Sequence, residues 1–566
     1  MKNFILSILL WVLVLSCTST TDIVIENPPF SVGTHSTVFI TEVRMNKKAT
    51  FLTMTIIFEP NKWYTVSSET YIVVNGEKHI VKSVDGIEFD EKIKADKSGK
   101  AVFTLEFDAI DPDAKQLDFL ESDCDKCFKI WGVELKSDVL TNRQEVPQEI
   151  KDAAIVTEDG KSLETPQFKA GKATIKGKYI GYVPDMNWVV NIRTFDHITG
   201  MEEEFGTPVM EDGSFELQVP MIITTQVIFS SASFNDCVLL SPDEETTIYI
   251  DLQQISCQQA QHRVDKCPES KYVYFGGANA EINNQFCDLN VIRDVSEPFF
   301  NEQVYTEISG MSSEKYKSYI LFKMNRVKKQ LERKGLTKKA LELAMINLRL
   351  KASYCLLSVN SAMTSSYAIT SYYNKKDGLV GYSPPVLDEN YFSFLKDFGI
   401  NRQKNLYSID FLYLFDKLSN VVNKSVDYTT VFQQLINKGA IDSEDIEIAE
   451  YIKKQAFKDI TPEIQQKITE FWKKYSDIIN KESGNITTAD VKYYLENTLE
   501  TSEGIIFDLL ETQQLGYNIA KNNPLIAEEF NKLSKMKNRI YYEHFKEKNN
   551  QLLNQIEVGK KEKSTQ

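Results

Sequence analysis

The chain has 566 residues, 42% of them hydrophobic and 26% charged, and its net charge is −15 at neutral pH. This composition is typical of folded globular proteins, and the length predicts three or four domains. The acidic balance argues against nucleic acid as a partner, because phosphates require a basic surface, and against attachment to anionic lipid by charge alone.

Residues 1–16 predict a signal peptide. Met1-Lys2-Asn3 gives a short positive start, and residues 4–15 form an apolar run too short to cross ~30 Å of hydrocarbon as a helix. The run ends Leu13-Val14-Leu15-Ser16-Cys17, which resembles the lipobox of bacterial lipoproteins. The resemblance implies cleavage before Cys17 and lipid on its thiolate, the nucleophile that this chemistry needs. The alternative is an ordinary signal peptide with a cysteine there by chance.

Residues 17–22 then predict a polar tether, and the membrane, reached through lipid on Cys17, is the expected partner. No later run reaches 18 apolar residues, so the sequence predicts no transmembrane helix. Thr18 rather than Asp after the cysteine is typical of sorting to the outer membrane. We therefore expect a bacterial cell-envelope protein, lipid-anchored at the outer membrane on its periplasmic face.

The first half of the mature chain predicts two immunoglobulin-like β-sandwich domains, at residues 23–137 and 170–255. Short alternating runs of apolar and polar residues, separated by turn residues, predict the strands of the first. Asn75-Gly76 between two such runs predicts a tight hairpin. Residues 138–169 are expected to be a polar linker, and residues 256–277 a connecting loop and strand.

Residues 278–558 predict a large all-α domain. Ser312 or Ser313 would cap one long helix, Thr337 a second that continues to about Met363, and Thr461-Pro462 a third through Trp472. A further start is predicted at residues 487–490 and one long charged helix at residues 527–555. Two subdomains are expected to meet near residues 384–385, and residues 559–566 predict a disordered tail.

Seven cysteines follow Cys17, and the expected compartment permits disulfides. Cys124 and Cys127 lie in a short turn between strand-like segments, where they either form a small disulfide or stay reduced. Asp123 and Asp125 beside them would raise a thiol pKa rather than lower it. Cys257 and Cys267 flank a polar loop and either pair as a staple or remain thiols. Cys355, within an apolar helix, is expected to pack in the core.

The other motifs predict no metal, no cofactor and no catalytic residue. The five histidines are scattered without the spacing of a metal site. The acidic turn at residues 108–113 lacks the central glycine and terminal glutamate of a calcium loop. Phe275-Gly276-Gly277 is not followed by the Lys-Ser/Thr of a phosphate loop. Most aromatic side chains fit the core, although an aromatic surface for a sugar or peptide stays an alternative.

Several stretches resemble one family, the lipid-anchored envelope thiol-disulfide oxidoreductases of the TlpA/thioredoxin-like group, in the region upstream of their thioredoxin domain. Glu26-Asn27-Pro28-Pro29-Phe30 resembles the mature start of that family, and Phe119-Leu120-Glu121-Ser122-Asp123 with Phe128-Lys129-Ile130-Trp131-Gly132-Val133 its signature. Tyr274-Phe275-Gly276-Gly277 resembles its junction between sandwich and helices. No W-C-x-x-C motif occurs, so the resemblance transfers architecture and cellular address but no catalytic residue.

The sequence therefore favours an envelope lipoprotein that serves as a non-catalytic binding or scaffold module. Its expected partner is a client protein or a separate oxidoreductase, which would make it an accessory to thiol-disulfide exchange. One alternative is a weak thiol-disulfide enzyme using Cys124 and Cys127, and another is a surface lipoprotein that binds glycans or peptides. A further alternative is a truncated or split gene, with the thioredoxin domain encoded next to it.

Overall fold

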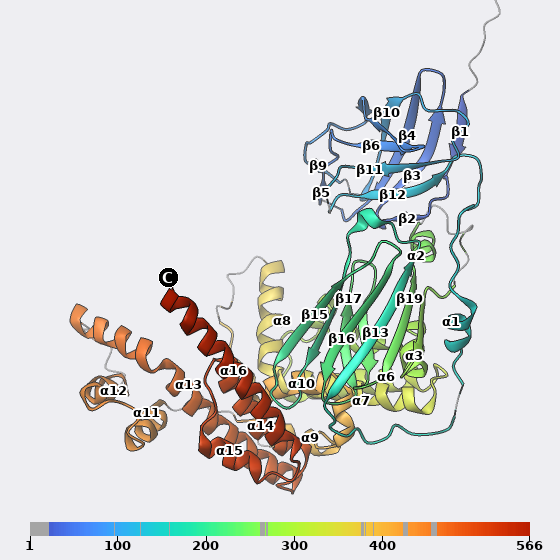
Figure 1. Ribbon diagram of the computed structural model, residues 1–566. Helices are drawn as coiled ribbons and strands as arrows, with labels where there is room; N and C mark the ends of the chain where they lie inside the picture. The colour runs from blue at the N-terminus through green and yellow to red at the C-terminus, as the bar shows by residue number, and fades with distance from the viewer. Residues whose placement is uncertain are drawn as a thin grey trace, which may run out of the picture.

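Three parts follow one another along the chain: a β domain, a second β domain and a helical domain (Figure 1). The computed structural model describes residues 22–565, except 61, 96, 125, 158, 261–266, 268–269, 375–378, 380, 389, 423–427 and 454–460, and omits the side chains from 559 onward. The predicted signal peptide and Cys17 lie outside the described residues. The expected division into a β-rich N-terminal half and a helical C-terminal half is confirmed.

The first domain consists of two five-stranded sheets around one core, with sheet orders β1-β3-β4-β10-β8 and β2-β12-β11-β6-β7, and a small β5-β9 ribbon. Its strands are β1 (Ile23–Glu26), β2 (Val32–Gly33), β3 (Val38–Met45), β4 (Ala49–Ile57), β5 (Trp63–Tyr64), β6 (Tyr71–Val74), β7 (Glu77–Ile80), β8 (Ser83–Asp85), β9 (Ile93–Lys94), β10 (Lys100–Asp108), β11 (Gln116–Leu120) and β12 (Lys129–Glu134).

Alternation along the strands explains how the two sheets of the first domain enclose its core. In β10, Phe103, Leu105 and Phe107 are buried while their neighbours face outward, the period of two that a half-buried strand requires. Asn75 and Gly76 both have positive φ angles and join β6 to β7, so the predicted hairpin is confirmed.

The second domain has two four-stranded sheets, ordered β16-β13-β19-β20 and β15-β14-β17-β18. β13 pairs antiparallel with β16 but parallel with β19. Its elements are β13 (Gly171–Ile180), β14 (Val189–Phe195), β15 (Glu202–Pro208), β16 (Ser214–Met221), β17 (Thr225–Ser230), β18 (Asn235–Leu240), β19 (Glu245–Asp251), the helix α2 (Leu252–Gln259) and β20 (Val273–Gly277). β20, which the sequence left in the connecting segment, completes the first of these sheets.

The predicted linker at residues 138–169 is tied to the second domain. It contains the short helix α1 (Gln148–Ala153), which packs on β20. The Arg143 guanidinium lies 3.3 Å from an Asp251 carboxylate oxygen, and the Gln144 amide donates to the Gln253 side chain at 3.0 Å. The polar residues that predicted a linker here include side chains that bond to the second domain.

The helical domain begins where the second β domain ends. Its α-helices are α3 (Ala280–Asp288), α4 (Val291–Ser296), α5 (Glu302–Glu307), α6 (Ser313–Leu331), α7 (Lys338–Leu357), α8 (Val359–Tyr373), α9 (Phe394–Asp397), α10 (Asp410–Leu418), α11 (Tyr428–Asn437), α12 (Ile446–Lys453), α13 (Pro462–Leu499), α14 (Ile505–Ala520), α15 (Ala527–Ser534) and α16 (Ile540–Thr565). Short 3₁₀ turns connect several of them, including residues Gln403–Tyr407. None of the described helices combines the length and apolar character needed to cross a bilayer.

The predicted caps hold at three helix starts. The hydroxyls of Ser312, Thr337 and Thr461 accept from the backbone amides three residues on, at the N-termini of α6, α7 and α13. The cap predicted at residues 487–490 is wrong. Thr487 lies inside α13, where its hydroxyl donates to the Ser483 carbonyl four residues back instead of capping a new helix.

Other helix boundaries differ from the predictions. The helix expected from Thr337 to Met363 is interrupted at Ser358, and the one expected over residues 527–555 is divided into α15 and α16. The backbone of α16 continues to Thr565, so the expected disordered tail is helical through that residue. Residues 384–385 mark no subdomain boundary, because one core cluster extends across them. A separate small core instead joins α11, α12 and the first half of α13.

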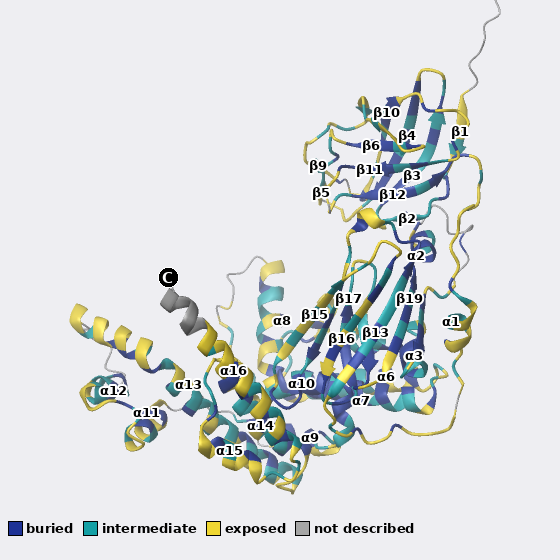
Figure 2. Cartoon of the chain, viewed as in Figure 1, coloured by how far each residue is buried: buried dark blue, intermediate teal, exposed yellow. Residues whose placement is uncertain are grey.

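Two joints connect the three parts. At the first joint, Val32 and Trp131 are paired on neighbouring strands of the first domain and are buried in the core of the second. At the second joint, Ile198, Ile223 and Leu239 of the second domain belong to the core cluster of the helices. Buried residues are seen where the strands of the second domain meet α7 and α10 (Figure 2). The joints fix the helical domain at the opposite end of the molecule from β1.

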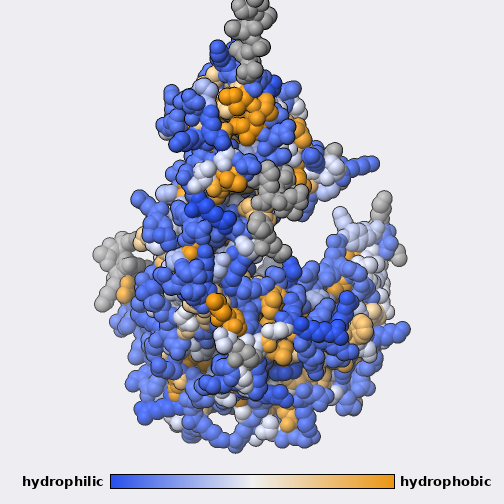
Figure 3. All heavy atoms as spheres, turned by 90° about the vertical axis from the view of Figure 1, so that its right-hand side faces the viewer, coloured by the Kyte–Doolittle hydropathy of each residue, from blue (hydrophilic) through white to orange (hydrophobic). Residues whose placement is uncertain are grey.

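Strand β1 lies on the side of the first domain that faces the viewer in Figure 3. Its Ile23 and Val24 side chains are exposed. That view shows a hydrophobic area near the top of the first domain, on a face that is otherwise largely hydrophilic.

Candidate functional site

The Cys124–Cys127 pair occupies the turn between β11 and β12. The two sulfur atoms are bonded, with Cα atoms 5.4 Å apart, and the Cys127 amide donates to the Cys124 carbonyl at 3.4 Å. Cys124 is exposed and Cys127 half-buried, so the bond is open to solvent on the Cys124 side. Asp125, named in the sequence prediction, lies outside the described residues.

Ser122 holds this turn together. Its hydroxyl accepts from the Cys124 amide at 3.2 Å and lies 3.0 Å from the Cys127 sulfur. A disulfide sulfur carries no proton, so the hydroxyl must be the donor to Cys127. The same hydrogen bond would stabilise a Cys127 thiolate if an attacking thiol opened the bond at Cys124.

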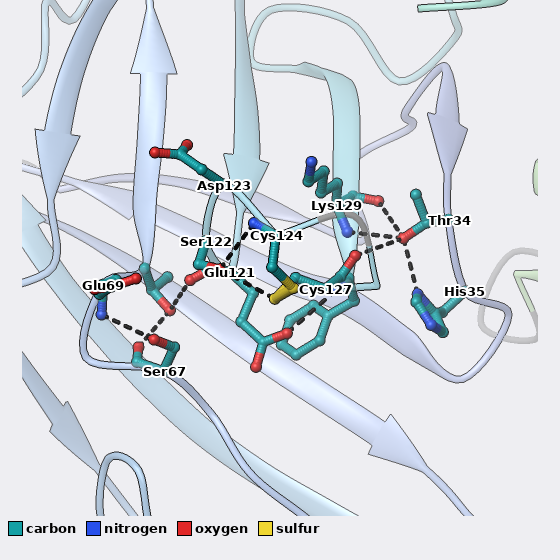
Figure 4. The surroundings of a disulfide bond; sticks show 12 residues. Thr34, His35, Ser67, Glu69, Glu121, Ser122, Asp123, Cys124, Cys127 and Lys129 are labelled. Carbon is teal, nitrogen blue, oxygen red and sulfur yellow. Dashed lines mark hydrogen bonds between the residues drawn. A yellow bond between two sulfur atoms is a disulfide. The ribbon is translucent and has the colours of Figure 1, made fainter. Parts of the chain in front are cut away.

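The Asp123 carboxylate points away from the disulfide (Figure 4). It accepts from the Tyr71 hydroxyl at 2.5 Å and lies 3.6 Å from the Lys78 ammonium. The Tyr71 hydrogen bond, followed by the Lys78 charge, holds the pKa of Asp123 below its ordinary value. Burial, with help from Asp123, raises the pKa of Tyr71 to about 12. The penalty that Asp123 was expected to impose on the thiols is therefore partly neutralised by Lys78.

The second disulfide and the free thiols lie deeper. Cys257 at the end of α2 is bonded to Cys267, with Cα atoms 5.7 Å apart. Cys237, Cys287 and Cys355 are the free cysteines in the described part of the chain. Burial raises the pKa of each of these three thiols to about 12, so they are poor nucleophiles at neutral pH. Cys355 is buried in α7, as its apolar surroundings predicted.

A cavity of about 790 Å³ opens between the second β domain and α16. Asp196, directly after β14, brings a buried carboxylate to it. His544 and Lys548, one turn apart on α16, bring two bases. The His544 imidazole lies 2.5 Å from Asp196, and Lys548 pairs with Glu203.

Both oxygens of the Asp196 carboxylate are engaged. One accepts from the Ile198 and Thr199 amides at 3.0 and 3.2 Å, and the other meets His544. Burial opposes ionisation of Asp196, but His544 and Lys548 outweigh it and leave its pKa below the ordinary value. These contacts fasten α16 to the second β domain. The sequence did not predict them, because 348 residues separate the pair.

An aromatic cavity of about 670 Å³ lies on the helical domain, between α5 and the end of α8. Phe300, Tyr305, Tyr372 and Tyr373 line it, and Tyr372 is 79% exposed. Exposed aromatic faces of this kind suit stacking on sugar rings or on the side chains of a peptide. The aromatic binding surface that the sequence left as an alternative would lie at this cavity.

Three carboxylates come together at Asp442, Glu444 and Asp445. The Lys474 ammonium lies 2.7 Å from oxygens of Asp442 and Asp445 and 3.9 Å from Glu444. Hydrogen bonds to the two aspartates raise the pKa of Lys474. The lysine therefore already occupies the position that a cation would take.

Comparison with known proteins does not assign this chain to a family. No family model matches the chain, and no curated protein or solved structure matches it either.

Proposed function

We propose that this chain is a bacterial envelope lipoprotein, anchored through Cys17 at the outer membrane, that serves as a non-catalytic binding or scaffold module. The observation that carries the proposal is the continuous connection of its parts. Two buried joints link the domains, and the helical domain lies at the opposite end of the molecule from β1. A lipid anchor before β1 would place the first domain next to the membrane and the helices away from it.

The exposed Ile23 and Val24 side chains agree with this orientation, because they follow the proposed tether directly and would face the lipid headgroups. The similarity to the upstream region of TlpA-like proteins supports a partner in thiol-disulfide exchange, such as a separate oxidoreductase or its client. As part of the same proposal, the two β domains are immunoglobulin-like spacers, and the helical domain presents the binding surface.

The test combines anchoring with cross-linking in cells. Wild type is expected to incorporate labelled fatty acid and to fractionate with the outer membrane, and Cys17→Ala to lose both. A photo-cross-linking residue placed at the exposed Phe322 or Tyr493 of the helical domain should give one adduct of defined mass that depends on the anchor. The matched control is the exposed Trp63 of the first domain. Equal adducts at all three positions, or label retained in Cys17→Ala, would contradict the proposal.

A second candidate function is weak thiol-disulfide exchange at Cys124 and Cys127. The exposed Cys124 and the Ser122 hydroxyl on the Cys127 sulfur favour it. Insulin reduction should then fall to background in Cys124→Ser, and Ser122→Ala should raise the pKa of the Cys127 thiol. Equal rates for wild type and Cys124→Ser end this candidate.

A third candidate is capture of glycans or peptides at the aromatic cavity between α5 and α8. Exposure of Tyr372 and Tyr373 beside Phe300 favours it. Tyr372→Ala combined with Tyr373→Ala should abolish binding on a glycan or peptide array, whereas Tyr517→Ala, an exposed tyrosine elsewhere, should not. An array on which the wild type binds nothing rules this candidate out.

A further inference from the structure

A cluster of basic side chains lines a cavity of about 620 Å³ on the helical domain, between α7 and the 3₁₀ turn at Gln403–Tyr407. Four lining residues are basic, namely Lys338, Arg349, Arg402 and Lys404, and one is acidic, Glu342. This local excess of positive charge occurs in a chain whose net charge is −15.

The one carboxylate is already occupied. One oxygen of Glu342 lies 2.7 Å from the Lys404 ammonium, and the other accepts from the Leu163 amide at 3.0 Å. Glu342 is therefore a partner of Lys404, and its remaining capacity to neutralise two further guanidinium groups is small.

Arg349 and Arg402 form no close ion pair with a carboxylate in the described part of the chain. Among the described residues, neither forms an ion pair within 4.0 Å, and the buried Nε of Arg349 has no hydrogen-bond partner. Burial and the neighbouring Arg402 charge lower the pKa of Arg349, and the Glu342 carboxylate only partly offsets them. Because the buried Arg349 N–H lacks a partner and Arg402 adds a second positive charge, both guanidinium groups would stabilise an anion bound between them.

The Arg402 side chain lies against Gly399. Its guanidinium lies over Gly399, where a Cβ atom would come within 2.3 Å of the Arg402 Nε. Gly399 also has a positive φ angle of 62°, which glycine adopts without strain. The glycine therefore leaves the space in which the Arg402 side chain lies beside the cavity.

We propose that this cavity binds a small molecule through an oxyanion, a phosphate or carboxylate group held between Arg349 and Arg402. The planar fork of a guanidinium matches two oxygens of either group. The hydroxyls of Ser162 and Thr165 line the same cavity as further donors, and Leu341 and Met345 offer apolar contact for the rest of the molecule. The inference stands independently of the lipid anchor.

The experiment titrates the mature chain with inorganic phosphate and, separately, with succinate, at ionic strength held constant with potassium chloride. Calorimetry and thermal unfolding are the readouts. We expect saturable binding of at least one probe and a rise in Tm that chloride does not reproduce. Binding of phosphate alone identifies a phosphate ligand, and binding of succinate alone a carboxylate ligand. Saturation by neither probe up to tens of millimolar overturns the proposal.

Variants separate the cavity from general charge effects. Arg402→Gln and Arg349→Met should each weaken binding at least about tenfold, and Arg349→Lys about tenfold because it keeps the charge but loses the fork. Arg326→Gln, an exposed arginine on α6, is the matched control and should bind as wild type does. Because Arg402 is exposed, Arg402→Gln decides the matter if Arg349→Met does not fold. Equal affinity in Arg402→Gln and wild type contradicts the site.

Discussion

The two joints of this molecule are built differently. The first is small: Val32 and Trp131 enter the second domain, and the Gly33 amide donates to the Ser256 hydroxyl at 3.2 Å. Both disulfides border it, because Thr34 beside Gly33 contacts the Cys127 carbonyl, and Cys257 follows Ser256. The second joint is a shared core with buried charges.

The difference indicates which parts can move independently. Apolar burial scales with area, so the shared core of the second joint should unfold together with both domains that it connects. The first joint depends on two side chains and on covalent links nearby. We therefore expect the second β domain and the helices to behave as one unit, and the first domain to loosen from it first.

The largest effect is expected from breaking the charge cluster of the second joint. Asp196→Asn leaves His544 and Lys548 without the buried carboxylate, which costs about 3–5 kcal/mol of unfolding free energy. The pKa of Asp196 is lowered in the fold, so its stabilisation is present above the ordinary value of 3.8 and is lost as the pH falls below it. Urea unfolding between pH 3 and pH 7 measures both effects.

The same variant tests whether the second β domain and the helices unfold as one unit. Hydrogen exchange should increase in α16 and in the second β domain together, and remain unchanged in the first domain. Asp416→Asn, at an exposed position of α10, is the control. Increased exchange confined to α16 would show that the second joint is not cooperative.

Removing apolar contact at the same joint should have the next largest effect. Ile223 is 1% exposed and lies in the core cluster of the helices, so Ile223→Ala should cost about 3 kcal/mol. Val24→Ala, in the exposed strand β1, should change stability by less than about 0.5 kcal/mol. Equal losses in the two variants would contradict a core at this joint.

The sequence predicted what local patterns determine. Alternation identified β4 and β10, and capping residues located the starts of α6, α7 and α13, because these signals lie within a few residues of the element. The joints left no such signal. In the sequence, Trp131 does not differ from other strand residues. Only the fold shows that the second domain covers the outer face of its sheet. α13 continued past its predicted end because tertiary packing outweighs local propensity.

The candidate sites also differ in whether neighbouring or distant residues form them. The neighbouring cysteines of the Cys124–Cys127 turn could be noticed from the sequence alone. Asp196 with His544, and Arg349 with Arg402, come from distant segments that only folding brings together. Cys17 stays a prediction, because it lies outside the described residues.

Opening the disulfide of α2 should weaken the first joint alone. Cys257→Ala with Cys267→Ala removes a cross-link across a separation of ten residues, which lowers the free energy needed to open α2 locally by about 2–3 kcal/mol. Exchange should rise in α2 and at β2 while α7 and α10 remain protected. Cys124→Ala with Cys127→Ala, across a separation of three, should cost less. A loss of protection in α7 would mean that the two joints are coupled.

The smallest effect is a gain in stability beside the second joint. Burial raises the pKa of Asp236 from 3.8 to about 6, and the Cys237 amide, which donates to the carboxylate at 2.7 Å, only partly offsets this. The folded state therefore prefers the protonated acid. That preference contributes stability below pH 3.8 and is lost as the pH rises through about 6.

Asp236→Asn, which keeps the acceptor oxygen and removes the charge, should stabilise the protein by about 2 kcal/mol at pH 7.5 and by almost nothing at pH 3.5. Thermal unfolding at the two pH values measures the difference. A variant less stable than wild type at pH 7.5 would mean that the Asp236 charge has a favourable partner, and that this edge of the joint is held by charge as Asp196 holds the other.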